Sequence, residues 1–231
     1  SHTTASDVVV TLSYSGTATG GGVDYTASSG TITILAGNLT GTATITSVDD
    51  AIFEGAETVI VDITGVTNGT ESGSQQETVT ITDDESAPTV TLSESGSPIA
   101  ENGGVSTITA TLSNPSTSAV TVDLGYSGTA TGGGTDYTAS GTQIIIAAGS
   151  TTGNVTITGD DDAIFEGAET VIVDITGVTN GTESGSQQET VTITDDEGAP
   201  TVTLSGRGSP VGESGGVSTI TATLSNPSTS A

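Results

Sequence analysis

The stretch AIFEGAETVIVDITGVTNGTESGSQQETVTITDDE at residues 51–85 occurs a second time, unchanged, at residues 163–197. The two copies are offset by 112 residues, and the flanking sequence follows the same offset. A period of this length is too long for one unit of a solenoid and fits a whole small domain. The sequence therefore predicts an array of near-identical domains, with boundaries in the turn-rich stretches at 83–88 and 195–200.

One full unit spans residues 88–197, and in it apolar residues alternate with threonine over short runs. Alternation of period two is typical of strands with one buried face, and the β-branched, polar Thr suits the solvated face. Seven such strands in so short a unit indicate an all-β fold of tandem, seven-stranded, antiparallel Ig-like β-sandwiches. We expect these strands at residues 89–93, 105–113, 120–126, 143–147, 152–158, 170–176 and 189–194.

The repeat divides the chain into three parts. We expect residues 1–85 to form a unit that lacks its first two strands, residues 88–197 to form a complete unit, and residues 200–231 to be the first two strands of a third unit. Both ends of the sequence fall at the same phase of the repeat, which allows two interpretations. Either the sequence is a window on a longer polypeptide, or residues 200–231 of one molecule complete residues 7–85 of the next, head-to-tail.

The charge balance restricts the possible partners. The 231 residues include one Lys or Arg and 28 Asp or Glu, for a formal net charge of −27, and there is no cysteine. Disulfides and Cys-ligated metals are therefore excluded, and nucleic acid is not an expected partner because its phosphates need basic residues. Membrane insertion is not expected either, since no apolar run reaches 18 residues. Cations are the natural partners of so acidic a surface.

Acidic residues gather in two stretches of the full unit. GDDDAIFEGAE at 159–169 contains five carboxylates, and DDE at 195–197 contains three more. Two carboxylates 4 Å apart repel each other by about 1 kcal/mol even in bulk water. With one Arg in the chain, the compensating charge must come from solution. Hard oxygen ligands without His or Cys favour Ca²⁺ over transition metals, and a cage of many carboxylates disfavours Mg²⁺.

At these positions the sequence resembles the Calx-β domain family. The matching segments are PTVTLSESGSPIAENGG (88–104), TDYT (135–138), DDAIFEGAE (161–169) and TITDDE (192–197). The resemblance implies a seven-stranded sandwich that binds Ca²⁺ at one end through these loops.

Position by position, the resemblance also implies a set of calcium ligands for each unit. In the complete unit they are Glu101, Asp136, Asp161, Asp162, Glu166, Glu169, Asp195, Asp196 and Glu197. In the first unit they are Asp24, Asp49, Asp50, Glu54, Glu57, Asp83, Asp84 and Glu85. Of the third unit, only Glu213 is present.

Near-identical repeats favour a structural role, because selection then acts on length and mechanics rather than on one special pocket. We expect a calcium-binding segment of an extracellular filament, stalk or giant adhesin, since extracellular modules bind Ca²⁺ at about 10⁻⁴–10⁻³ M. Its partners would be calcium ions and either copies of itself head-to-tail or further repeats of the same chain.

Two other functions compete with the structural role. The first is an adhesive module that recognises a sugar or protein through loops at a sandwich end, although only 3% of the residues are aromatic. The second is an enzyme, such as a glycosidase with two carboxylates. An enzyme is not expected, because almost no basic residue is present to support a reaction.

Overall fold

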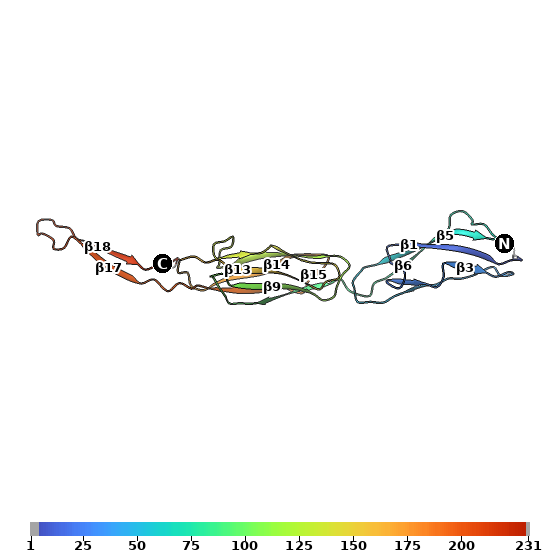
Figure 1. The fold of residues 1–231 in the computed structure, drawn as a ribbon, viewed down its shortest axis with the longest axis horizontal. Helices are drawn as coiled ribbons and strands as arrows, with labels where there is room; N and C mark the ends of the chain where they lie inside the picture. Colours follow the sequence, from blue (N-terminus) through green and yellow to red (C-terminus); the bar gives the residue numbers. More distant parts are fainter. Residues whose placement is uncertain (1–4, 230–231) are drawn as a thin grey trace. The chain divides into compact units, whose positions relative to one another are not determined.

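The computed structural model describes residues 5–229, which form eighteen strands and no helix (Figure 1). The strands group into two compact units. The first unit comprises residues 1–87 with 114–118, and the second comprises residues 88–113 with 119–231. No helix in the described part of the chain is long and apolar enough to cross a membrane.

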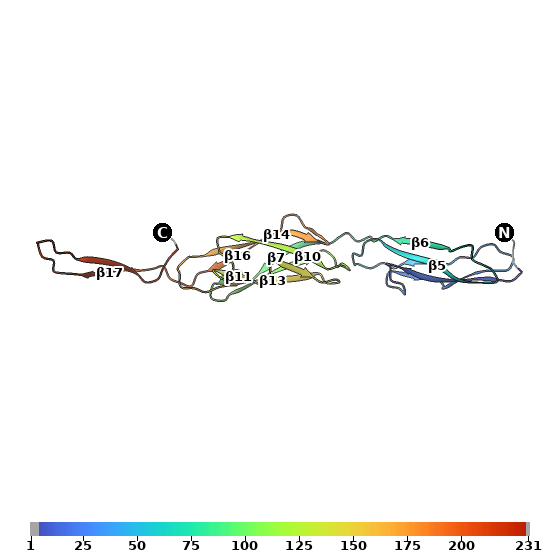
Figure 2. The same cartoon turned by 90° about the horizontal axis from the view of Figure 1, so that it is seen from above.

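The second unit contains a sandwich of two five-stranded sheets, whose long strands run side by side in Figure 2. In spatial order, the first sheet consists of β12 (Gln143–Ile146), β10 (Val120–Gly128), β14 (Glu169–Thr179), β16 (Gln188–Thr194) and β8 (Ile99–Ala100). The second sheet consists of β11 (Tyr137–Ala139), β13 (Thr152–Gly159), β9 (Val105–Leu112), β7 (Thr89–Ser95) and β15 (Thr182–Glu183).

The core of this sandwich follows directly from the alternating sequence. In β14, Val171 and Val173 are fully buried, and Ile172 between them is partly exposed. Ile108 and Ala110 of β9 and Val90 of β7 close the core from the other sheet. Burying a Val or Ile side chain contributes roughly 1.5–3 kcal/mol, so this single cluster supplies most of the driving force for folding of the unit.

The structure confirms the expected sandwich, and each of the seven expected strands is present. It adds three strands of two or three residues, namely β8, β11 and β15, which are too short to show a periodicity. Two of them pair in parallel, β15 with β7 and β8 with β16. β8 pairs in parallel with β16 because the chain, after β7 in the second sheet, crosses over and runs along the edge of the first sheet.

The first unit is less complete. One four-stranded sheet contains β3 (Thr31–Ile34), β1 (Val8–Gly16), β5 (Glu57–Thr67) and β6 (Gln76–Ile81), and a second contains only β2 (Tyr25–Ala27) and β4 (Ile45–Ser47). Among the described residues, its buried apolar side chains are Ala18, Tyr25 and Val59. Among the described residues of this unit, no strands correspond to β7 and β9.

The remaining strands, β17 (Val202–Arg207) and β18 (Thr219–Leu224), pair antiparallel as a hairpin, drawn in red in Figure 1. Every residue of both strands is exposed. The hairpin thus has the backbone pairing of β7 with β9 without the second sheet that β7 and β9 cover.

Candidate metal centres

The acidic loops of the second unit meet at one end of its sandwich. β16 ends beside β8, where the Glu101 amide donates to the Thr194 carbonyl at 3.0 Å. β14 begins at the same end, because Glu169 pairs with Ile193. The Asp160 amide, just after β13, donates to the Asp136 carbonyl at 3.0 Å. Loops from five places in the sequence therefore bring their carboxylates to one end of the sandwich.

Three groups of carboxylates form there, and within each group one oxygen per residue lies within 4.8 Å of the others. Glu101 belongs to two of the groups and is itself buried, with 7% of its surface exposed. The three groups are Glu101 with Asp161 and Asp196, Glu101 with Asp162 and Glu197, and Asp136 with Glu166 and Glu169.

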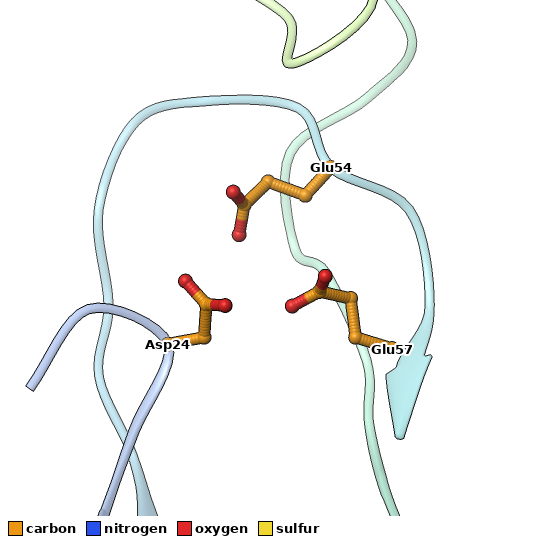
Figure 3. A group of neighbouring side chains, drawn as sticks. All are labelled: Asp24, Glu54 and Glu57. Atoms are coloured by element: carbon orange, nitrogen blue, oxygen red, sulfur yellow. The ribbon is translucent and has the colours of Figure 1, made fainter. Parts of the chain in front are cut away.

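The first unit repeats this arrangement with two groups. Figure 3 shows Asp24, Glu54 and Glu57 with their carboxylates pointing toward a common centre. The other group is Asp49, Asp84 and Glu85. Both groups line one cavity of about 130 Å³, which has room for ions and for water.

Asp83 and Asp195 lie in none of these groups and instead hold the acidic loop in place. Asp195 Oδ2 accepts the Glu166 amide at 2.6 Å and the Gly167 amide at 2.5 Å, and Asp195 Oδ1 accepts the Glu197 amide at 2.8 Å. Asp83 makes the equivalent bonds in the first unit. Burial opposes the ionisation of both carboxyls, but these amide hydrogen bonds outweigh burial and lower both pKa values.

The loop geometry explains why these amides converge. Gly167 has φ of 80° and Gly55 has φ of 78°, a left-handed conformation that glycine adopts without strain. Two successive amides then point to the same side and form a nest for a carboxylate. The Glu-Gly pair in each copy was the sequence feature that indicated this nest. The expected ligand set did not separate a carboxylate that accepts these amide hydrogen bonds from one that binds a metal ion.

Two other expected ligands lie outside the groups. Asp50 lines the cavity of the first unit, and its Oδ1 accepts the Ile52 amide at 2.8 Å. Glu213 lies on the exposed turn of the hairpin between β17 and β18. The assignment of individual ligands therefore stays a prediction, while the grouping of fourteen of the eighteen expected residues is visible in the structure.

Mutual repulsion and burial leave several of these acids poorly ionised in the absence of a cation. Burial, followed by hydrogen bonding to Asp136, raises the pKa of Glu169 to about 7. Burial, followed by the charges of Asp196 and Glu101, raises the pKa of Glu197 to about 7. Burial and the charge of Asp24 also raise the pKa of Glu57.

One oxygen in each unit is enclosed and without a hydrogen bond. Glu57 Oε2 and Glu197 Oε2 are buried, and neither accepts a hydrogen bond from any described residue. A buried carboxylate oxygen without a donor is unfavourable unless a positive charge compensates it. The all-oxygen donor set, its high charge and its unsatisfied oxygens all suit a hard divalent cation of the size of Ca²⁺.

The Calx-beta domain family matches residues 1–85 and again residues 83–197. The chain belongs to this family. The two matches confirm a tandem of Calx-beta domains, and the structure confirms the all-β fold expected for them. No match was found among curated proteins.

Three solved structures of Calx domains are similar to this chain at low identity. The CBD12 domains of CALX1.2 are 16% identical with a TM-score of 0.39, over 84% of this chain and 89% of theirs. The calcium-binding domain CBD12 of CALX1.1 is 14% identical with a TM-score of 0.34, over 81% of this chain and 87% of its own. The apo form of the Calx CBD1 domain is 21% identical with a TM-score of 0.41, over 48% of this chain and all of its own.

Proposed function

We propose that each Calx-beta unit of this chain binds Ca²⁺ through the carboxylate groups at one end of its sandwich. The observation that carries the proposal is the convergence of these groups without a compensating side chain. The single basic residue, Arg207, lies on the exposed strand β17 and is not among the residues that line the groups. A bound cation supplies the missing positive charge.

Calcium fits these groups better than the alternatives. Ca²⁺ takes six to eight oxygen ligands in flexible geometry, whereas Mg²⁺ demands a near-ideal octahedron and retains several of its waters. Transition metals prefer imidazole or thiolate, and the chain has one His and no Cys. Adjacent groups that share Glu101 further favour two neighbouring ions in the second unit.

The biological role that we infer is structural. Repeats that are identical over residues 51–85 and 163–197 suit a calcium-binding segment of an extracellular filament, stalk or giant adhesin, assembled head-to-tail or continued by further repeats. A permanently occupied site outside the cell agrees with the millimolar range of extracellular calcium modules. The proposed role is binding and mechanical, without catalysis.

The alternative role, adhesion to a sugar or protein through the end loops, receives less support. Tyr25 and Tyr137 are buried, and each packs against a second tyrosine at 6.4 Å between ring centroids. These four rings serve the cores of their units, so they are not available as a flat platform for a sugar ring.

Calorimetric unfolding in chelator and in millimolar Ca²⁺ tests the proposal. Calcium should raise the melting temperature, because a ligand that binds only the folded state stabilises it by mass action. Asp196→Ala, in a carboxylate group, should remove most of the increase for the second unit. Asp174→Ala, on β14 and outside the groups, should retain it. Superimposable unfolding curves with and without calcium would overturn the proposal.

A further inference from the structure

The buried carboxylate of Glu101 is shared by two of the three carboxylate groups in the second unit. It lies in the turn that follows β8, and its Oε1 accepts the Asp162 amide at 3.4 Å. In one of its groups Glu101 stands with Glu197, whose Oε2 is enclosed and accepts no hydrogen bond from any described residue. The placement of Glu101 therefore decides whether either of these two groups can form.

The backbone that carries Glu101 is fixed to the edge of the first sheet. The Glu101 amide donates to the Thr194 carbonyl at 3.0 Å. The Thr194 hydroxyl donates to the Ile99 carbonyl at 3.0 Å, and the Thr192 amide donates to Ser97 Oγ at 3.0 Å. Because these bonds hold β8 and its flanking residues on β16, the segment cannot withdraw from the second sheet without breaking them.

On its other side, the same backbone lies directly against Gly159, the last residue of β13. Gly159 pairs with the buried Tyr137 of β11, and its amide donates to the Gly104 carbonyl at 2.9 Å. A Cβ atom at Gly159 would lie 2.5 Å from the Ala100 carbonyl oxygen and 2.8 Å from Glu101 Cα, whereas ordinary contact begins at 3.4 Å. Both atoms belong to the backbone, so no rotation of a side chain relieves the overlap.

We propose that Gly159 is a positioning residue for the calcium groups of the second unit, because only a residue without a Cβ lets the Glu101 backbone lie against the end of β13. Any other residue would displace Glu101 by about 1 Å, several times the tolerance of about 0.2 Å on metal–ligand distances. The inference rests on the proposed function and adds to it the residue that sets how many calcium groups the unit forms. The remaining group, which consists of Asp136, Glu166 and Glu169, does not use Glu101 and should be independent of Gly159.

The first unit shows that a serine is compatible with the strand itself. Ser47 stands one repeat before Gly159 and ends β4. Ser47 pairs with Tyr25 in the way that Gly159 pairs with Tyr137. The tyrosine pairs of both units also have the same distance of 6.4 Å between ring centroids. A serine at position 159 therefore conflicts with the Glu101 backbone and not with strand pairing or with the packing of the tyrosines.

Calcium titration of the full chain tests the assignment. Equilibrium dialysis against increasing free Ca²⁺ measures the ions bound per chain, and Glu101→Gln identifies the binding that depends on Glu101. In Gly159→Ser this binding should require about 10- to 100-fold more calcium, the usual loss when the support of a metal ligand is removed. The matched control is Gly141→Ser in the same unit, where the Cβ would meet its nearest atom at 3.6 Å. It should titrate like the parent chain.

The double variant Gly159→Ser/Glu101→Gln distinguishes positioning from a general structural effect. If Gly159 acts through Glu101, the double variant should titrate like Glu101→Gln alone, because the second change then has nothing further to displace. A general weakening of the unit would instead reduce calcium binding further in the double variant. That further loss would overturn the proposal, and so would a titration of Gly159→Ser that matches the parent chain.

Thermal unfolding in chelator shows whether the second unit of each variant is folded. Gly159→Ala adds the Cβ alone and should lose the same calcium binding as Gly159→Ser. If the second unit were unfolded in both variants, the contact would carry the fold itself, and the assignment of Gly159 as a positioning residue would be wrong.

The same titrations separate this inference from the proposed function. A parent chain without saturable calcium binding would refute the proposed function. Saturable binding by the parent chain that Glu101→Gln weakens and Gly159→Ser leaves unchanged would refute the inference alone, and so would binding that neither variant weakens. Binding that both single variants weaken, with no further loss in the double variant, is the result that the proposal predicts.

Discussion

Residues 51–85 and 163–197 have the same sequence and different surroundings. Val191 is fully buried and Ile193 is 3% exposed, but their equivalents Val79 and Ile81 are respectively exposed and half-buried. The local sequence sets the strands β5 and β14 to the same bounds within each copy. Burial depends instead on β7 and β9, for which the described residues of the first unit include no counterpart. The sequence of a strand therefore sets its bounds, whereas the sheet that packs on it sets the burial of its side chains.

The acidic ends differ for the same reason. Among the described residues, the second unit has three carboxylate groups and the first has two, because Glu101 follows β8, which has no counterpart in the described part of the first unit. The group of Asp24, Glu54 and Glu57 matches that of Asp136, Glu166 and Glu169 and needs no residue from the missing strands. One proposed calcium position therefore depends only on the identical segment and its neighbouring turn, and the others also depend on the residue that follows β8.

The largest contrast should come from truncating one isoleucine in each copy. Ile193→Ala removes a buried side chain and should cost about 2–5 kcal/mol in the free energy of unfolding of the second unit. Ile81→Ala should cost less than half as much in the monomer, because its side chain is half-exposed. Urea denaturation of dilute protein followed by circular dichroism measures both. Equal costs would show that the first unit is already covered.

Calcium removal should have the next largest effect. At free calcium 100-fold above the dissociation constant, binding at one site stabilises the unit by about 2.7 kcal/mol. Asp162→Ala should remove the contribution of its carboxylate group in the second unit only, and Glu54→Ala should remove that of its group in the first. Thermal unfolding that resolves the two units checks the pair. A loss in both units from either variant would contradict separate sites.

The effect of pH on the free energy of unfolding should be smaller, and its direction should reverse when calcium binds. In chelator the pKa values of Glu169 and Glu197 are about 7, against an ordinary 4.5. The folded state then binds more protons than the unfolded state between these values, so stability is greatest below pH 4.5 with respect to these groups and is lost as pH rises to 7. Bound calcium should displace these protons and restore stability above pH 7.

Melting temperatures at pH 5 and pH 8, with and without calcium, measure this reversal. Glu169→Gln should weaken the pH dependence in chelator, since the amide does not titrate. A melting temperature in chelator that rises from pH 5 to pH 8 would contradict the assigned direction of the pKa shifts.

The sequence alone was sufficient to predict the sandwich and the gathering of acidic loops at one of its ends. Alternation in runs such as 105–113 and 170–176 predicts strands because the side-chain period of a strand is two. The short strands β8, β11 and β15 have no such signal, since their pairing depends on neighbours far along the chain. Likewise, Asp195 and Asp196 are adjacent acids with different contacts. Only the fold shows that Asp195 accepts amide hydrogen bonds from the acidic loop, whereas Asp196 belongs to a carboxylate group.

Isothermal titration calorimetry with Ca²⁺ at pH 7, in buffers of different ionisation enthalpy, tests the central claim most directly. The account predicts saturable Ca²⁺ binding with release of protons, because Glu169 and Glu197 are partly protonated before the ion binds. The released protons should decrease in Glu169→Gln. The absence of calcium heats, or binding of equal strength for Mg²⁺, would contradict a calcium site built from these carboxylates.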